Sequence, residues 1–317
     1  MEQGNKKPLI ILTGPTAVGK TDTSISLAKA VGGEIISADS IQIYRHMDIG
    51  SAKITKEEMQ GVPHFLIDAL LPDEEFNVVV FQKLALQAME EIYERGHIPI
   101  ITGGTGFYIQ ALLYGIDFDE TDTDNSYRKE LEEFANEHGA EALHERLAKV
   151  DEESAKAIHP NNVKRVIRAL EYHKQTGGKI SEHNEEQRQK ESPYHFAYFV
   201  LNRDRAILYD RINRRVDVMF EQGLVAEVRR LLDMGYTRKL VSMQGLGYKE
   251  VAAYLEGELS LEEAKEIIKR DTRHFAKRQI TWFKRESDVD WIDMEKYADT
   301  EEVVAALQEL LKEKGII

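Results

Sequence analysis

The chain has 317 residues, 42% hydrophobic and 31% charged, which is the composition of a folded globular protein with room for about two domains. It has no cysteine, which excludes disulfides, cysteine-bound zinc and a catalytic thiol, and no apolar run approaches the roughly 20 residues of a membrane span or forms a signal peptide. The net charge of −14, taken as a whole, argues against a nucleic-acid partner. These properties predict a cytoplasmic protein.

The first third of the chain alternates short apolar runs with amphipathic segments. Strands are predicted at residues 8–13, 33–38, 65–69 and 98–102, and helices at residues 21–31, 78–95 and 107–114. Apolar runs of this length, separated by amphipathic helices, are typical of βαβ units and therefore indicate a mostly parallel sheet.

The pattern changes after Gly115. An acidic, turn-rich stretch at 117–124 indicates a boundary, and residues 126–176 are predicted to form three or four short helices without strands. A polar stretch at 180–191 is predicted to be mobile. The strand pattern returns at 196–201, and helices are predicted at 204–222, at 224–234 and from there to the C-terminus.

These elements predict an α/β fold in which a P-loop NTPase-like parallel sheet is flanked by helices and interrupted by an inserted all-helical domain. The α/β core with its C-terminal helices is assigned to residues 1–117 and 192–317. The inserted domain is assigned to residues 118–191.

The most specific motif is the run Gly14-Pro15-Thr16-Ala17-Val18-Gly19-Lys20-Thr21, which matches G-x-x-x-x-G-K-[ST]. In such a loop the backbone amides and the start of the following helix converge on phosphate groups. Lys20 adds a mobile positive charge, and the Thr21 hydroxyl is a ligand for Mg²⁺. The predicted strand before the loop and the predicted helix after it supply the setting that the motif needs. The sequence therefore predicts that this chain binds a polyphosphate.

Asp39 follows the second predicted strand, so its carboxylate is expected at the same edge of the sheet as the P-loop. It is a candidate general base and a second candidate ligand for Mg²⁺. The alternative is that Asp39 forms a turn or caps a helix.

Two further groups are weaker candidates. A second glycine loop, Gly103-Gly104-Thr105-Gly106, follows another predicted strand and opens a helix, so its amides and the Thr105 hydroxyl could approach a substrate. Arg211 and Arg215 are four residues apart on one helix face, a spacing that suits a diphosphate.

Charge is distributed unevenly along the chain. Residues 117–153 contain 14 acids and 4 bases, whereas residues 265–285 contain 8 bases and 2 acids. A bound polyanion senses the local field, so the basic stretch is either a solvated helix face or a surface for RNA. Lys164, Arg165 and Arg168 lie away from the apolar face of their predicted helix, where they could reach an RNA backbone.

Together these motifs resemble the bacterial tRNA dimethylallyltransferase (tRNA isopentenyltransferase) family over nearly the whole chain. The motifs that carry the resemblance are GPTAVGKT (14–21), SADSIQIYRHMDIGSAK (37–53), PHFLID (63–68), PIITGGTGFYIQALLYG (99–115), HPNNVKRVIRALE (159–171), RINRRVD (211–217), MQGLGYKE (243–250) and KRQITWF (277–283). A chain without cysteine cannot carry the zinc finger of eukaryotic relatives, which favours the bacterial type.

The resemblance implies transfer of the dimethylallyl group of dimethylallyl diphosphate to N6 of the adenosine next to the anticodon in tRNA. It implies that the P-loop holds the diphosphate leaving group rather than ATP, although such loops are commonly described as ATP-binding. The implied cofactor is Mg²⁺, and the implied partners are dimethylallyl diphosphate and a tRNA with an adenosine-rich anticodon loop. Nothing in the sequence demands more than a monomer.

The resemblance also implies roles for individual residues. Asp39 is the expected general base, and Thr21 and Arg215 act with it in catalysis. The P-loop residues 14–21 and Arg215 are expected to bind the diphosphate and its Mg²⁺. The residues expected to contact tRNA are Asp39, Ser40, Ile41, Gln42, Thr105, Arg128, Lys164, Arg165, Val166, Ile167, Arg168 and Gln244.

Three other functions compete with this interpretation. A P-loop kinase would use ATP and employ Asp39 as the base at a hydroxyl group. An adenylate isopentenyltransferase would act on free AMP or ADP, although a mononucleotide does not require the helical insertion. A non-catalytic RNA- or nucleotide-binding regulator would keep its function without Asp39.

Overall fold

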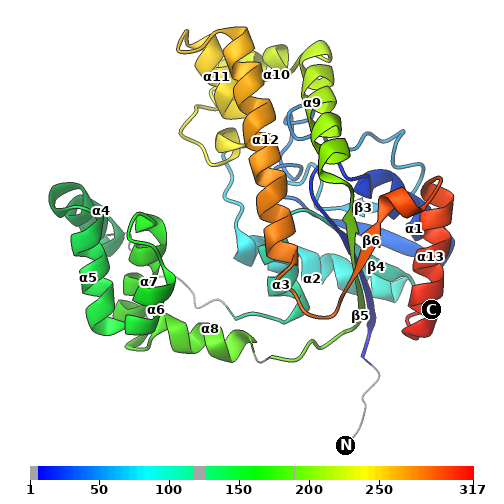
Figure 1. The fold of residues 1–317 in the computed structure, drawn as a ribbon, viewed down its shortest axis with the longest axis horizontal. Coiled ribbons are helices and arrows are strands. Elements are labelled where there is room, and N and C mark those ends of the chain that lie inside the picture. The colour runs from blue at the N-terminus through cyan, green and yellow to red at the C-terminus, as the bar shows by residue number, and fades with distance from the viewer. Residues whose placement is uncertain (1–5, 118–125, 189) are drawn as a thin grey trace, which may run out of the picture. The chain divides into compact units, whose positions relative to one another are not determined.

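The fold is built on one six-stranded sheet in which every strand runs parallel to its neighbours (Figure 1). The computed structural model describes residues 6–117, 126–188 and 190–317. The strand order is β3-β2-β4-β1-β5-β6. The strands are β1 (Pro8–Thr13), β2 (Gly33–Ala38), β3 (His64–Phe65), β4 (Ile98–Gly103), β5 (His195–Asn202) and β6 (Val289–Asp293). The predicted α/β fold with a parallel sheet is thus confirmed.

The middle of the sheet is buried on both faces. In β1, Leu9, Ile10, Ile11 and Leu12 are all buried, and the β1–β4 register pairs Ile10 with Ile100. Such strands read as continuous apolar runs rather than alternating ones, which is why the sequence identified them.

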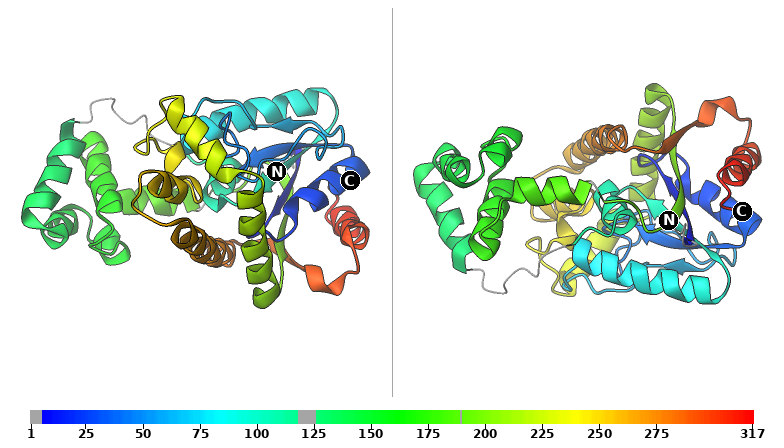
Figure 2. Two further views of the ribbon diagram at one scale, coloured as in Figure 1. Left: turned by 90° about the horizontal axis from the view of Figure 1, so that it is seen from above. Right: turned by 90° about the horizontal axis from the view of Figure 1, so that it is seen from below.

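Helices cover both faces of this sheet, with α2 on one face and the neighbouring α1 and α13 on the other (Figure 2). The helices packed around the sheet or beyond its edge are α1 (Lys20–Val31), α2 (Val78–Glu94), α3 (Gly106–Leu113), α9 (Arg205–Glu221), α10 (Leu224–Asp233), α11 (Tyr248–Leu255), α12 (Leu261–Phe283) and α13 (Thr300–Glu313), with two short 3₁₀ helices, η1 (Ser242–Gln244) and η2 (Met294–Lys296). The apolar sides of α1, α9, α12 and α13 form one core with the sheet.

Two elements differ from the sequence prediction. The strand expected at 65–69 ends at Phe65, because Leu66 (φ 61°) and Asp68 (φ 53°) adopt left-handed backbone that a strand cannot continue through. The region expected to be helical up to the C-terminus contains the edge strand β6. Its β-branched and aromatic residues Val289, Trp291 and Ile292, which favour strands, were the available signal.

The chain divides into two compact units, one comprising residues up to Leu113 and from Pro193 onward, the other Tyr114–Ser192. The second unit is helical in its described part: α4 (Ser126–His138), α5 (Ala140–Val150), α6 (Glu152–Ala157), α7 (Val163–Thr176) and α8 (Ile180–Arg188). The segment predicted to be mobile at 180–191 thus contains a helix. The acidic boundary predicted at 117–124 lies, apart from Asp117, outside the described residues.

A buried carboxylate organises the second unit. Asp151, 1% exposed, caps α6 by accepting a hydrogen bond from the Ser154 amide (3.0 Å). It also accepts bonds from the Ser154 hydroxyl (2.7 Å) and from the amide and hydroxyl of Ser181 (3.0 and 2.6 Å). Because Ser181 lies at the start of α8, one side chain anchors the beginnings of two helices.

Among the described residues, none of the helices combines the length and the apolar character that crossing a membrane requires.

Candidate active site

The P-loop, residues 14–21, joins β1 to α1 at the carboxyl end of the sheet. Gly14 has φ 147°, and a Cβ at this position would lie 2.5 Å from the Leu201 carbonyl oxygen of β5, so only glycine fits. Gly19, with φ 115°, directly precedes the first residue of α1. The first amides of a helix have no partner within the helix and carry the positive end of its dipole. The loop is therefore shaped to receive an anion, as the motif predicted.

Lys20, the first residue of α1, lies folded against this loop. Its Nζ donates to the carbonyl oxygens of Gly14 (3.0 Å) and Pro15 (2.9 Å). Burial lowers the pKa of Lys20 to about 8; the positive charge of Arg215 acts in the same direction, and the carboxylate of Asp39 opposes them. A cation whose charge is disfavoured in the free protein gains strongly from an incoming anion.

Asp39 and Arg215 lie close enough to Lys20 for their charges to shift its pKa. Asp39 Oδ1 accepts hydrogen bonds from the amides of Ile41 (2.8 Å) and Gln42 (3.3 Å), so the turn-forming role is real, but neither bond uses Oδ2. On α9, burial lowers the pKa of Arg215, and Asp39 is the largest opposing influence. Within the described part of the chain, Arg215 donates no hydrogen bond and forms no ion pair. The site thus holds a desolvated guanidinium that has no partner of its own.

Two other arginines support the backbone of the P-loop. Arg203 Nε donates to the Val18 carbonyl oxygen (2.9 Å), and its Nη1 pairs with Glu295 (2.6 Å). Arg211 Nε donates to the carbonyl oxygen of Ala17 (2.8 Å), which has a left-handed backbone with φ 64°. Arg211, considered with Arg215 as a diphosphate ligand, is therefore occupied at Nε by the loop itself.

The second glycine loop lies directly beside the strand end that carries Asp39. The Thr105 amide donates to the Ala38 carbonyl oxygen (3.2 Å), and a Cβ on Gly103 would lie 2.3 Å from the same oxygen. The Thr13 hydroxyl of β1 donates to the Gly103 carbonyl oxygen (2.6 Å). The structure thus brings together the P-loop, Asp39, Arg215 and Thr105 within one unit.

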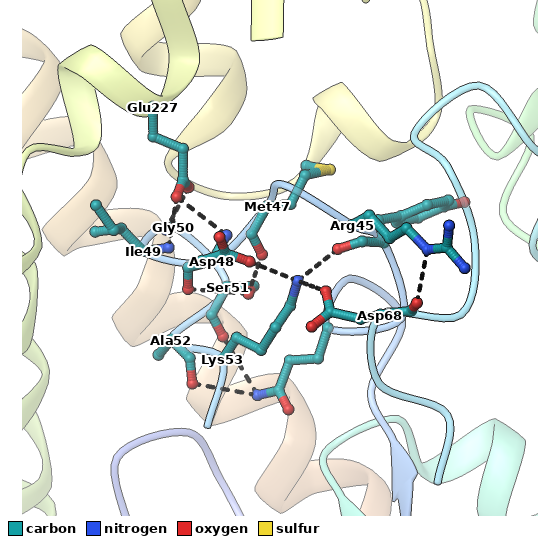
Figure 3. A network of polar contacts seen from close by, with 12 residues as sticks. Arg45, Met47, Asp48, Ile49, Gly50, Ser51, Ala52, Lys53, Asp68 and Glu227 are labelled. Atoms are coloured by element: carbon teal, nitrogen blue, oxygen red, sulfur yellow. Dashed lines mark hydrogen bonds and ion pairs between the residues drawn. The ribbon is translucent and has the colours of Figure 1, made fainter. Parts of the chain in front are cut away.

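The segment that follows Asp39, here called the 40–53 loop, is organised by a buried lysine (Figure 3). The Lys53 side chain is only 4% exposed and pairs with the carboxylates of Asp48 (2.7 Å) and Asp68 (2.6 Å). Its ammonium also donates to the Tyr44 carbonyl oxygen (2.6 Å). Lys53, at the end of this loop, therefore holds the earlier part of the loop and the segment after β3 together.

A buried carboxylate from α10 holds the middle of the same loop (Figure 3). Glu227 accepts hydrogen bonds from three consecutive amides, those of Asp48 (3.1 Å), Ile49 (2.8 Å) and Gly50 (3.1 Å). The Tyr248 hydroxyl donates to Glu227 Oε1 (2.8 Å), and a Cβ on Gly50 would lie 2.6 Å from the Tyr248 ring. Helices α10 and α11 thus fix the 40–53 loop through its backbone.

Three of the residues predicted to contact tRNA lie near this loop. The Gln42 side chain donates to carbonyl oxygens of the loop itself, at 3.3 and 3.4 Å. Gln244 is exposed in η1 and donates to the Arg238 carbonyl oxygen. Ile41 packs against Gly245, where a Cβ would lie 3.2 Å from the Ile41 Cδ1. The 40–53 loop and the segment around Gln244 are therefore neighbours, although more than 200 residues separate Ile41 from Gly245 in the sequence.

Five other residues predicted to contact tRNA lie in the second unit, on α7. Lys164, Arg165 and Arg168 are exposed. Val166 and Ile167 are buried in that unit's core, at 0% and 3% exposure, so their side chains are not available to RNA. The basic side chains of α7 remain the predicted contacts.

Arg128 has a structural partner in the same unit. Its Nε and Nη2 donate to the two carboxylate oxygens of Glu171 at 2.9 and 2.7 Å, a bidentate pair that joins α4 to α7. Any contact of Arg128 with RNA would have to be made while its guanidinium is paired with Glu171.

The side chains around the P-loop can supply only one or two ligands to Mg²⁺. Thr21 is exposed at the start of α1, and Asp39 keeps Oδ2 outside its turn. Across the described residues, no three His, Asp or Glu side chains gather as they do in a protein-built metal site. Mg²⁺ is commonly held by one or two protein groups together with phosphate oxygens and water, and this donor set matches that arrangement.

With this geometry in view, the chain was compared with known proteins. The model of the family described as IPP transferase matches residues 42–286. The chain belongs to the IPP transferase family. A relative from Lachnoclostridium phytofermentans, named tRNA dimethylallyltransferase, is 63% identical over 311 residues and covers 98% of this chain and 99% of its own length. A relative of the same name from Acetivibrio thermocellus is 50% identical over 308 residues, covering 97% and 98%.

Solved structures of the family match the fold along the whole chain. A tRNA isopentenylpyrophosphate transferase from Bacillus halodurans is 47% identical with a TM-score of 0.73, covering 98% of each chain. One from Staphylococcus epidermidis is 43% identical with a TM-score of 0.72, covering 97% and 100%. A eukaryotic dimethylallyltransferase described as acting on tRNA is 29% identical with a TM-score of 0.83, covering 97% of this chain and 80% of that one.

Several residues that build the site were not identified from the sequence. Lys53 and Gln279 lie inside motifs that carry the family resemblance, but no pattern in the sequence indicates their partners. Glu227 contacts amides that are at least 177 residues away in the chain, and Arg203 contacts a carbonyl 185 residues away. Contacts of side chains with distant backbone groups leave no spacing pattern in a single sequence.

Proposed function

We propose that this protein transfers the dimethylallyl group of dimethylallyl diphosphate to N6 of the adenosine that follows the anticodon in tRNA. The observation that carries the proposal is the nearly full-length similarity, at 63% and 50% identity, to relatives named tRNA dimethylallyltransferase. The charged groups around the P-loop supply the chemistry that this reaction needs. The proposed partners are dimethylallyl diphosphate and a tRNA with an adenosine-rich anticodon loop, bound by a monomer in the cytoplasm.

The leaving group is assigned to the P-loop. As the allylic C–O bond breaks, negative charge accumulates on the diphosphate, and Lys20 and Arg215 are the cations that stabilise it. In the part of the chain that the structure describes, neither cation has a carboxylate partner within hydrogen-bond distance, so both are free to move onto phosphate oxygens. Bound Mg²⁺, held by Thr21 together with phosphate oxygens of the substrate and water, would add further positive charge to the leaving group.

The base is assigned to Asp39. The exocyclic amine of adenine is a poor nucleophile because its lone pair is delocalised into the ring, so removal of its proton as the C–N bond forms raises its reactivity. Oδ1 of Asp39 is held by two backbone amides, which fixes the orientation of the carboxylate. Oδ2 is the oxygen that accepts the proton.

The target base has to leave its stack in the anticodon loop, at a cost of about a few kcal/mol. The 40–53 loop and the exposed cations of α7, Lys164, Arg165 and Arg168, are the surfaces proposed to hold the RNA. The chain as a whole is acidic, so the RNA contact has to be local, and binding has to weaken steeply with salt.

The test is transfer of label from dimethylallyl diphosphate to an unmodified tRNA with an adenosine-rich anticodon loop, with Mg²⁺ and without ATP. Label in the tRNA, with none in free AMP, supports the proposal. Label only in AMP would instead make the protein a mononucleotide prenyltransferase. Turnover of ATP with no transfer of label would make it a kinase.

Asp39→Asn separates the base from the turn in the same assay. Asparagine keeps an oxygen for the amides of Ile41 and Gln42 but cannot take a proton, so the single-turnover rate is expected to fall about 1,000-fold, with tRNA affinity kept. Asp299→Asn is the matched control, because Asp299 also accepts a backbone amide, at the start of α13. An Asp39→Asn rate within threefold of this control would contradict the assignment of the base.

A further inference from the structure

One buried side chain of α12 connects the P-loop to the second glycine loop. Gln279 is 6% exposed, and its Oε1 accepts a hydrogen bond from the Thr16 amide (2.9 Å). Its Nε2 donates to the Gly104 carbonyl oxygen (3.0 Å). Because one end of the amide group meets a donor and the other an acceptor, the side chain has one satisfied orientation.

Gly104 has its identity explained by this contact. A Cβ at Gly104 would lie 2.0 Å from Gln279 Nε2, whereas the nearest other atom outside that side chain is the Gly14 carbonyl oxygen at 3.9 Å. The backbone of Gly104 is not in the left-handed region, so its conformation does not by itself require glycine. The missing side chain therefore serves the approach of Gln279.

The connection continues to the base. The residues on either side of Gly104 both lie against the Ala38 carbonyl oxygen: the Thr105 amide donates to it, and Gly103 packs against it without room for a Cβ. Ala38 is covalently joined to Asp39. A short path of contacts thus runs from the P-loop through Gln279 and the second glycine loop to the strand end that carries Asp39.

We propose that Gln279 is a positioning residue that sets the separation between the diphosphate loop and the base. This inference rests on the proposed function, in which the leaving oxygen and the attacking nitrogen both react at one allylic carbon. The groups that serve these two atoms must be held at a fixed separation, and misplacement by about 1 Å can cost a factor of about 100 in rate. Gln279 is suited to this task because it projects from α12, a helix of 23 residues.

A double-mutant cycle between Gln279 and Gly104 tests the proposal. Gln279→Ala removes both hydrogen bonds, and Gly104→Ala forces the amide away from its place. Each variant is expected to lower kcat about 100-fold at saturating substrates. The double variant is expected to be no slower than Gln279→Ala alone, because the added methyl group then fits the space left by the glutamine.

A split between kcat and KM distinguishes positioning from binding. Arg203 and Arg211 still hold the P-loop carbonyls when Gln279 is lost, so KM for dimethylallyl diphosphate is expected to change by less than about threefold. Tyr93→Phe is the matched control, because it removes a side-chain hydrogen bond to the Pro8 carbonyl oxygen (2.9 Å) at the other end of β1. Its kcat is expected to equal that of the wild type.

The outcomes separate the two proposals. A wild type that transfers no label overturns the proposed function. An active wild type with a Gln279→Ala kcat within threefold of Tyr93→Phe overturns the positioning role alone, and so do multiplicative losses in the cycle. If Gln279→Ala fails to fold, Gln279→Met retains the volume, still lacks both hydrogen bonds, and decides the same question through its kcat.

Discussion

Buried charged side chains lie at both ends of the parallel sheet, and those of Glu34, Lys20 and Arg215 differ in how far they are paired with opposite charges. At the start of β2, Glu34 is 1% exposed and accepts two bonds from Arg95, at 2.8 and 2.7 Å, and one from His97, at 2.6 Å. At the opposite end, Lys20 and Arg215 are desolvated, and among the described residues no carboxylate lies within hydrogen-bond distance of either.

The difference separates charges that serve folding from charges that serve binding. The bonds from Arg95 hold the pKa of Glu34 below its usual range in spite of burial, so the folded state stabilises the ionised carboxylate. At the P-loop the folded state instead disfavours the charged forms, because burial lowers the pKa of both Lys20 and Arg215. Under the proposed function, a bound phosphate would offset the unfavourable burial of these cations.

The largest effect on the reaction is expected from removal of Arg215. Arg215→Met keeps an unbranched side chain but removes the charge and the hydrogen-bond donors of the guanidinium, so kcat/KM for dimethylallyl diphosphate is expected to fall about 100-fold. The free energy of unfolding is expected to stay the same or rise, because a desolvated charge without a partner is lost. Steady-state kinetics and urea denaturation measure the two quantities.

Arg214→Met is the matched control for this prediction. It makes the same change of charge at the adjacent residue, where an exposed arginine pairs only with Asp210 on the same helix. Its kinetics are expected to remain within twofold of the wild type. Equal losses in the two variants would mean that the overall field, and not a site, attracts the diphosphate.

The two ends of the sheet also differ in how far the sequence predicted them. The P-loop and Asp39 were found because phosphate binding imposes a local motif on consecutive residues, with glycines where amides must converge. The bounds of β1 and β2 were predicted correctly from continuous apolar runs. Strand β6 was missed because it lies at an edge of the sheet and Asp290 interrupts its apolar residues, so no continuous apolar run marks it.

What the sequence could not supply were the residues that hold the site in place. Gln279 reaches the P-loop across 263 residues, and Glu227 reaches the 40–53 loop across at least 177. Their partners are backbone amides and carbonyls, which every residue has, so no complementary side chain marks the other end of the contact. The burial of Val166 and Ile167, by contrast, follows from the apolar spacing of α7, which indicates a helix face that packs into a core.

The second prediction addresses the amino end of the sheet. Glu34→Gln removes the charge that balances Arg95 and weakens the hydrogen bond with His97. The free energy of unfolding is expected to fall by about 2 kcal/mol at pH 7, because a buried carboxylate loses its charge-assisted hydrogen bonds. The kcat and KM values are expected to remain those of the wild type. Urea denaturation beside a kinetic assay tests both statements.

The pH dependence of this effect has a definite sign. Because the pKa of Glu34 is lowered on folding, its stabilisation is complete above the pKa of the unfolded chain and is lost as the pH falls through the lower folded value. The difference between wild type and Glu34→Gln is therefore expected to shrink below about pH 4.5. A difference that grows on acidification would mean that Glu34 is not the anion in this cluster.

The smallest expected effect concerns the charge on Lys20. With its pKa lowered to about 8, the free protein loses this cation as the pH rises through 8, whereas a bound diphosphate holds the proton on. The kcat/KM for dimethylallyl diphosphate, which reports the free enzyme, is expected to fall about tenfold between pH 7 and pH 9.

Lys20→Arg identifies the group that titrates. Arginine keeps a positive charge throughout this range, so the fall between pH 7 and pH 9 is expected to disappear even if the variant is slower at every pH. A profile that keeps its inflection near pH 8 in Lys20→Arg would assign the titration to another group. In that case burial would not disfavour the charged form of Lys20. Only Arg215 would then distinguish the carboxyl end of the sheet from the amino end.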